Sequence, residues 1–170
     1  MAAEVFVADE QDAFVIDIER YARLATDVLG AEGVRGETEV SLLFVEEEAI
    51  AELNQRFLGR SGPTDVLAFP IDDAPEPGGR SPDEGGTGPG GSSYDDGVMP
   101  LLLGDVVVCP AVASAGAAEH GVALQDEIAL LVVHGLLHLL GMDHAEESEA
   151  EEMERREREL LERFGALGTR

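Results

Sequence analysis

The sequence predicts a single α+β domain whose central element is a strongly apolar helix near the C-terminus. Three observations support this prediction. The 170 residues are enough for one domain with a core of its own. Hydrophobic residues make up 44% and charged residues 28% of the chain, as is usual for a globular protein. Strand-like and helix-like patterns follow one another along the chain without an internal repeat.

The N-terminal part of the chain predicts strands and helices in alternation. Alternating or β-rich runs predict strands at residues 4–8, 39–45 and 64–70. Apolar residues recur at helical spacing from Phe14 to Leu29, and Gly30 is the expected end of that helix. A second helical pattern covers residues 46–57.

The C-terminal part begins with a segment that is poor in apolar residues. Residues 72–98 hold eight Gly, four Pro and seven acidic residues, which predicts a flexible loop. The expected elements after this loop are a strand at residues 101–109 and helices at residues 111–119, 125–140 and 147–164. Pro110 fits the start of the first of these helices, and Gly141 fits the end of the apolar one.

The charge balance restricts the possible partners. The chain has 36 acidic and 11 basic residues, all of the latter arginine, for a net charge of −25. A surface of this kind repels polyanions and membranes as a whole, so any contact with nucleic acid must be local. The alternative interpretation is a solvated acidic surface without a specific functional meaning.

The sequence also predicts a soluble cytoplasmic protein. Cys109 is the only cysteine, which excludes an intrachain disulfide and fits a reducing compartment. Acidic residues close to Met1 leave no basic region of the kind that opens a signal peptide. The longest apolar stretch, residues 128–140, is interrupted by two histidines and is too short to span a bilayer.

A histidine cluster at residues 134–144 (HGLLHLLGMDH) predicts a metal site. His134 and His138 are four residues apart, so a helix presents both rings on one face. The turn after Gly141 can bring His144 back to the same ion. Three imidazoles with an open fourth position are typical of a catalytic zinc, although nickel or copper would also bind there. The alternative is a set of ordinary core histidines, and His120 is interpreted as a helix-end residue outside the cluster.

The spacing of these histidines matches that of metzincin proteases, H-E-x-x-H-x-x-G-x-x-H. Gly135 stands where those enzymes carry the glutamate that acts as general base. Glycine cannot perform this step, which argues against a protease. A glycine in a helix interior also indicates that something needs room beside the metal.

The cluster resembles the H-G-x-L-H-L-x-G-x-D-H signature of the YbeY family, bacterial single-strand-specific endoribonucleases and rRNA maturation factors. Four further blocks fit the same family in the right order: LNQRF (53–57), GPTDVLAFP (62–70), LLGDVVVCP (102–110) and EIALLVVHG (127–135). The resemblance covers roughly residues 4–164 and implies that residues 1–170 form one metal-dependent hydrolase domain. It implies an α+β fold with a mixed four-stranded sheet, packed against the central apolar helix, and a zinc-like ion in a three-histidine cleft.

The resemblance also implies the activity. His134, His138 and His144 would be the ligands of one zinc ion in an endoribonuclease that matures the 3′ end of small-subunit rRNA and serves ribosome quality control. Such a metal acts as a Lewis acid on phosphate or supplies hydroxide near neutral pH. The residues expected to act in catalysis are His134 and Asp143, the latter first as a partner that orients a ligand imidazole and alternatively as an acid or base.

One position departs from the family pattern. Many members carry an arginine after the aromatic residue of the LNxxF block, where this chain has Leu58. Arg56 and Arg60 flank it and are candidates for binding substrate phosphate, although a shifted guanidinium is not equivalent to one in place. The alternative for both is a solvated surface arginine.

Other polar residues have structural interpretations. Thr64 and Asp65 are expected to fix the turn before a strand. Asp105, a polar residue within an apolar strand, should have a partner, and a place near the metal cleft is the alternative. The 72–98 loop is expected to be a disordered insertion, with covering of the cleft or contact with the ribosome as alternatives.

Three classes of function therefore stand side by side. The first is a metal-dependent endoribonuclease whose partners are single-stranded rRNA and the small ribosomal subunit, without a membrane. The second is a non-catalytic ribosome-assembly factor with a structural metal, because an acidic surface suits contact with a basic ribosomal protein. The third is a metalloprotease, which only the ligand spacing supports.

Overall fold

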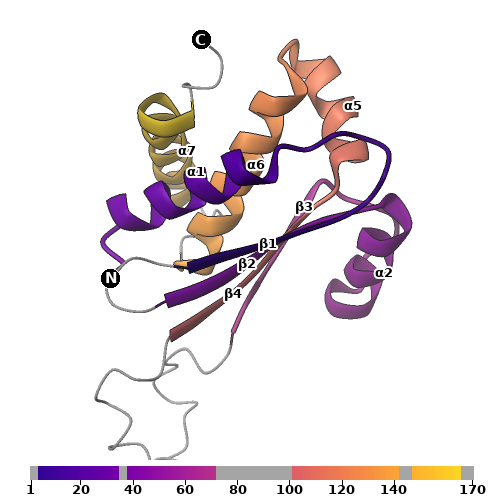
Figure 1. Ribbon diagram of the computed structural model, residues 1–170, viewed down its shortest axis with the longest axis horizontal. Coiled ribbons are helices and arrows are strands. Elements are labelled where there is room, and N and C mark those ends of the chain that lie inside the picture. Colours follow the sequence, from indigo (N-terminus) through magenta and orange to yellow (C-terminus); the bar gives the residue numbers. More distant parts are fainter. Residues whose placement is uncertain (1–3, 35–37, 72–100, 142–146, 166–170) are drawn as a thin grey trace, which may run out of the picture.

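The computed structural model describes residues 4–34, 38–71, 101–141 and 147–165 (Figure 1). In chain order its elements are β1 (Glu4–Glu10), α1 (Ile18–Ala31), β2 (Thr38–Val45), α2 (Glu47–Leu58), β3 (Val66–Pro70), β4 (Leu101–Val108), α5 (Pro110–His120), α6 (Leu124–Leu139), α7 (Glu147–Leu160) and a π-helical turn, η1 (Leu161–Gly165). This order confirms the predicted succession of strands and helices. The predicted loop at residues 72–98 lies outside the described residues.

The four strands form one mixed sheet in the order β1-β2-β4-β3. β1 pairs with β2 and β2 with β4 in parallel, whereas β3 is antiparallel to β4. α1, α6 and α7 lie on one side of the sheet and α2 on the other (Figure 1). The α+β class and the mixed four-stranded sheet are thus confirmed, and β3 is an edge strand.

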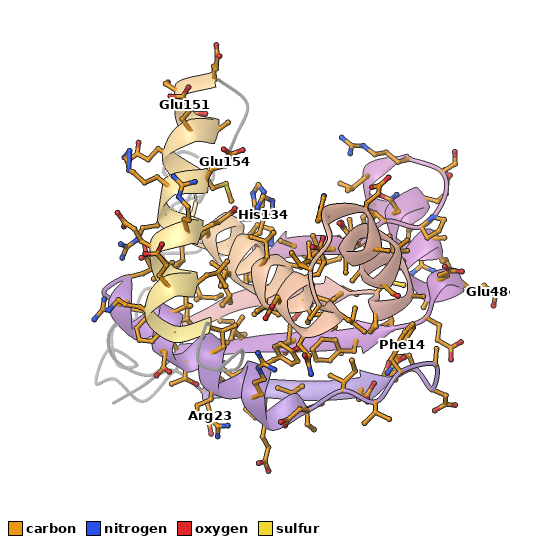
Figure 2. All side chains as sticks on the ribbon, turned by 90° about the horizontal axis from the view of Figure 1, so that it is seen from above. Phe14, Arg23, Glu48, His134, Glu151 and Glu154 are labelled. Carbon is orange, nitrogen blue, oxygen red and sulfur yellow. The ribbon has the colours of Figure 1, made fainter. Side chains whose placement is uncertain are left out.

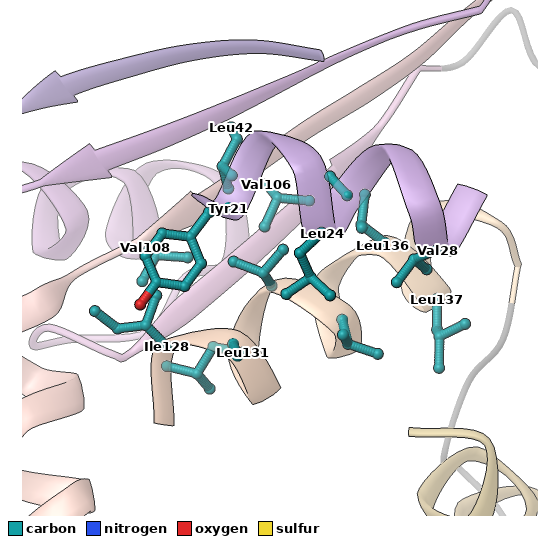
Figure 3. Close-up of a cluster of buried hydrophobic side chains, with 14 of the residues drawn as sticks. Tyr21, Leu24, Val28, Leu42, Val106, Val108, Ile128, Leu131, Leu136 and Leu137 are labelled. Atoms are coloured by element: carbon teal, nitrogen blue, oxygen red, sulfur yellow. The ribbon is translucent and has the colours of Figure 1, made fainter. Parts of the chain in front are cut away.

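The main core lies between the sheet and the helices α1 and α6. Tyr21 and Leu24 of α1 point toward Ile128 and Leu131 of α6, and Val106 of β4 closes the cluster from the sheet (Figure 3). Side chains of this kind each contribute roughly 1.5–3 kcal/mol when fully buried. α6 is therefore apolar on several faces, which agrees with its predicted place at the centre of the fold.

Tyr21 joins this core through both parts of its side chain. Its ring lies 5.8 Å from that of Phe44, and its hydroxyl donates to the backbone oxygen of Gln125 at 3.2 Å. Burial is the main reason why the pKa of Tyr21 rises to about 12. The phenol therefore stays neutral and fixes α1 to the first turn of α6.

A second, smaller core lies on the other side of the sheet, under α2. It consists of Val45, Ile50, Leu67, Val107 and Cys109. Cys109 is fully buried, and this burial raises the pKa of its thiol. The sulfur therefore acts as a small apolar side chain and not as a reactive group.

The bounds of α1 differ from the prediction at both ends. The helix begins after Asp17, whose carboxylate accepts from the backbone N–H of Arg20, so the predicted start at Phe14 is wrong. It also continues past Gly30 and is closed by Gly33, which has a φ of 87°. A glycine in the last turn is tolerated, whereas the left-handed residue that ends a helix strongly favours glycine.

Among the described helices, none is by itself long and apolar enough to cross a membrane. α5 and α6 meet the length and hydropathy criteria only when taken together, and they are bent by 112° at their junction.

Candidate metal centre and substrate cleft

A cavity of about 450 Å³ lies over the edge strand β3, between the C-terminal parts of α2 and α6. Its walls come from residues 54–60 and 64–70, which follow one another in the chain, and from residues 134–138, which lie far from both in the sequence. The lining residues are Asn54, Leu58, Arg60, Thr64, Asp65, Val66, Leu67, Ala68, Pro70, His134, Gly135 and His138. The blocks LNQRF, GPTDVLAFP and HGLLHLLGMDH, which carry the family resemblance, therefore meet at one place.

His134 and His138 both face this cavity from α6. Their rings are one helical turn apart, with centroids 4.7 Å from each other and an interplanar angle of 77°. The predicted third ligand His144 and the predicted catalytic residue Asp143 lie outside the described residues. Within the described part of the chain, no group of three or more His, Cys, Asp or Glu side chains could hold a metal ion. The structure thus brings together two of the three predicted ligands.

The environment of His134 fits a metal-binding imidazole. Its side chain is 27% exposed, and Nδ1 pairs with a carboxylate oxygen of Glu157 on α7. Figure 2 shows His134 on the part of α6 that lies next to α7. An imidazole whose Nδ1 donates to a carboxylate presents Nε2 as its ligating atom, which is the usual arrangement of histidines in zinc sites. The donor set that α6 offers is therefore suited to a zinc-like ion.

The structure gives a different reason for the glycine at position 135 from the one that the sequence suggested. A Cβ added to it would lie 2.6 Å from Cγ1 of Val106, a side chain of β4. The glycine therefore lets α6 approach the sheet, and the space that it provides is taken up by Val106. The interpretation that room is needed beside the metal is wrong in this respect.

Four residues of β3 line the cavity: Val66, Leu67, Ala68 and Pro70. Leu67 lines it although its side chain is buried, and the backbone of Asp65 accepts from the N–H of Cys109, the residue that follows β4. In an antiparallel pair the residues that bond to the neighbour alternate with those that point away. Val66 and Ala68 therefore direct their N–H and C=O groups outward, over the cavity. This edge offers backbone donors to a ligand.

Asn54 positions the loop that carries Arg60. The Asn54 side chain is 5% exposed; its amide donates to the backbone oxygen of Gly62 at 3.0 Å. The backbone N–H of Arg60 donates in turn to the carbonyl of Asn54 at 3.3 Å. The buried Asn54 thus holds the loop after α2 in place. Arg60 belongs to this loop and lines the cavity. No sequence pattern indicates this role of Asn54, because it depends on the contact to Gly62 that the folded loop creates.

The two predicted phosphate-binding arginines are placed differently. Arg60 lines the cavity, whereas Arg56 is exposed and meets Glu52 at 3.5 Å on the same helix. Leu58, at the family's arginine position, also lines the cavity and is 49% exposed. Of the two flanking arginines, Arg60 is therefore the one near the histidines.

Asp65 and Asp105 differ in whether they line the cavity. Asp65 lines the cavity beside Thr64, whose hydroxyl donates to its carboxylate at 3.5 Å. The sequence pattern of Asp65 indicated only a turn residue. The structure places its carboxylate in the cleft. Asp105 shares with Val107 the face of β4 that lies toward α2, and it is not among the residues that line the cavity. The alternative that places Asp105 near the metal cleft stays a prediction.

His120 ends α5, as predicted, and contacts α6. Its Nδ1 donates to Oε1 of Glu127 at 3.1 Å, and Glu127 is 4% exposed. This hydrogen bond is the main reason why the pKa of His120 is raised. The pair connects the two helices outside the cavity.

Comparison with known proteins agrees with the geometry. The family model described as Endoribonuclease YbeY matches residues 6–165. A protein of Thermobifida fusca named Endoribonuclease YbeY is 47% identical over 145 residues, covering 85% of this chain and 84% of the relative. A second of the same name, from Beutenbergia cavernae, is 40% identical over 164 residues, covering 96% and 97%.

A solved structure shows the same fold. The solution structure of TM1509 from Thermotoga maritima aligns with a TM-score of 0.55 at 23% identity, covering 95% of this chain and 92% of the other. At this level of identity the likeness concerns the fold alone. The match of the family model over most of the chain and the identity to relatives of similar length lead to one conclusion: the chain belongs to the Endoribonuclease YbeY family.

Proposed function

We propose that this protein is a metal-dependent, single-strand-specific endoribonuclease that matures the 3′ end of small-subunit rRNA and takes part in ribosome quality control. The observation that carries the proposal is the pair His134 and His138 on a cavity, with a carboxylate on the first imidazole. The relatives named Endoribonuclease YbeY support the reaction class, hydrolysis of phosphodiester bonds.

The proposed metal site uses three histidines. His134 and His138 hold the ion from α6, and His144 is proposed as the third ligand on sequence grounds alone. A zinc ion held there supplies positive charge for the phosphoryl oxygens, on which negative charge grows in the transition state. Nickel or copper would suit the same imidazoles.

The other groups of the cleft would act on the RNA strand itself. The guanidinium of Arg60 binds a phosphate, and the outward N–H groups of Val66 and Ala68 donate to oxygens of the backbone. Asp65 offers a carboxylate that can accept a proton from the attacking group. For Asp143 the proposal stays with the role of a partner that orients a ligand imidazole.

The negative charge of the whole protein limits the RNA footprint. With a net charge of −25, contacts to phosphate are favourable only where arginines gather. The proposed substrate is therefore a short single-stranded segment, presented by the small ribosomal subunit in the cytoplasm.

A second candidate function is a non-catalytic ribosome-assembly factor. Leu58 in place of an arginine and the acidic surface favour it, since such a surface suits a basic ribosomal protein. A metalloprotease has weaker support, because Gly135 replaces the general base of that mechanism.

The test compares the zinc-loaded parent with His138→Ala, purified in the same way, on single-stranded and double-stranded RNA of the same sequence. The proposal expects the parent to cleave single strands and the variant to lose this activity. Equal cleavage by both would indicate a contaminating nuclease. Zinc binding by the parent without any cleavage would instead favour the assembly factor.

A further inference from the structure

Glu157, whose carboxylate contacts His134, is a buried acidic residue. It is 7% exposed and lies on the face of α7 that also carries Met153 and Leu160, both buried in the core. Burial of an ionised carboxylate among apolar side chains is strongly unfavourable unless a partner compensates the charge. The position therefore needs an explanation that the apolar contacts of α7 do not provide.

Arg155 and Arg156, which precede Glu157 on α7, pair with other carboxylates. Arg156 meets Glu32, the residue that follows α1, at 2.5 Å and Glu159 at 2.8 Å, and Arg155 meets Glu152 at 4.0 Å. The carboxylate of Glu157 instead turns inward and meets Nδ1 of His134. These two residues are 23 positions apart and belong to different helices, so tertiary packing creates the pair.

This contact determines how the imidazole can be protonated. An ionised carboxylate can only accept hydrogen bonds, so Nδ1 of His134 must carry the proton. The lone pair of the neutral ring is then on Nε2, on the opposite side of the ring from Glu157. The ring lines the cavity, as does that of His138 with its centroid 4.7 Å away.

The geometry points to Glu157 as a positioning residue: it holds His134 in the Nδ1–H tautomer and turns Nε2 toward the metal, so that metal affinity depends on α7. This inference rests on the metal-dependent function proposed above. The carboxylate fixes the orientation of the ligand, and this strengthens the bond to the ion.

The first experiment measures zinc affinity by competition with a chromophoric chelator. Glu157→Leu should bind zinc about 10- to 100-fold more weakly than the parent, the usual cost of losing such a partner. Two control variants separate positioning from other effects. Glu154→Gln removes one charge from an exposed position of the same helix. Glu32→Gln breaks the ion pair between α7 and α1 without touching His134.

The second experiment reads the tautomer directly in the metal-free protein. Long-range ¹H–¹⁵N correlation spectra should show Nδ1–H for His134 in the parent and in both controls. In Glu157→Leu the ring should shift toward the Nε2–H form, which is the commoner tautomer of neutral histidine in water. This readout does not depend on activity or on bound metal.

The outcomes separate the two proposals. Equal zinc affinity in the parent and Glu157→Leu, or an Nε2–H tautomer in the parent, overturns the positioning role alone. A parent with the Nδ1–H tautomer that binds no zinc overturns the metal-dependent function, and with it the role of Glu157. An equal loss in Glu32→Gln would assign the effect to the docking of α7. If Glu157→Leu does not fold, Glu157→Met decides, since it also removes the acceptor and an affinity equal to that of Glu154→Gln would again overturn the inference.

Discussion

Gly135 of α6 lies so close to Val106 of β4 that a methyl group on its α carbon would come within 2.6 Å of Cγ1. Val106 is fully buried and stiff at its branched carbon, so it has little freedom to move away. The two histidines of the cleft flank this contact on α6. The distance between helix and sheet at this point therefore determines where the imidazoles stand over β3.

Gly135→Ala should destabilise the protein despite the better helix propensity of alanine. Overpacking of a core costs about 1–3 kcal/mol, and the gain in propensity is at most about 1 kcal/mol. Denaturant unfolding monitored by circular dichroism measures the difference. Combined with Val106→Ala, the substitution should cost less than the sum of the two single changes, by about 0.5 kcal/mol or more. Strict additivity of the two would contradict the proposed contact.

Much of the fold is predictable because its signals are local. The apolar period of α6 and the β-rich runs indicate elements whatever surrounds them. α1 shows where this fails, since Phe14 continues the helical spacing although the helix begins only after Asp17. The spacing of apolar residues does not indicate where a capping carboxylate begins the helical backbone.

The site is predictable only in part, because only some of its residues are indicated by local patterns. The pair His134 and His138 follows from spacing within one helix, which a sequence displays directly. The roles of Asp65 and Glu157 depend on contacts between elements that are far apart in the chain, and that of Asn54 depends on how the following loop folds back to it at Gly62. Asp65 in particular had the pattern of a turn residue, because nothing local indicates that the outer edge of β3 lines a cleft.

Arg60→Gln should weaken the binding of single-stranded RNA, whereas Arg56→Gln should leave it nearly unchanged. Arg60 lines the cavity, and Arg56 pairs with Glu52 on an exposed helix face. Removal of one phosphate contact should also reduce the slope of log affinity against log salt by about 0.7. Fluorescence anisotropy with labelled RNA at several salt concentrations, in the cleavage-deficient His138→Ala background, measures both effects. Equal losses in the two arginine variants would contradict this assignment.

The contact between His120 and Glu127 should make stability depend on pH. Because the pKa of His120 is raised in the folded protein, its contribution is fully present below the unfolded pKa of about 6.5 and is lost as the pH rises through the folded value. The parent should therefore exceed His120→Gln in thermal stability near about pH 5.5, and the difference should vanish near about pH 9. In a Glu127→Gln background the same histidine substitution should show a much smaller pH dependence, and an unchanged one would assign the effect to other groups.

Leu58→Arg should increase RNA affinity and cleavage. Leu58 lines the cavity and is 49% exposed, so an arginine there needs no rearrangement of the core. Surface changes of this kind alter stability by no more than about 0.5 kcal/mol. The new guanidinium would occupy the position at which many family members carry an arginine, which Arg60 does not. It should increase the slope of log affinity against log salt by about 0.7. Cleavage rates of the parent and the variant on the same single-stranded RNA, together with thermal melting of both proteins, test this. A variant that is as stable as the parent but cleaves no faster would contradict this prediction. It would show that Arg60 already supplies the phosphate contact and that Leu58 does not lower the cleavage rate.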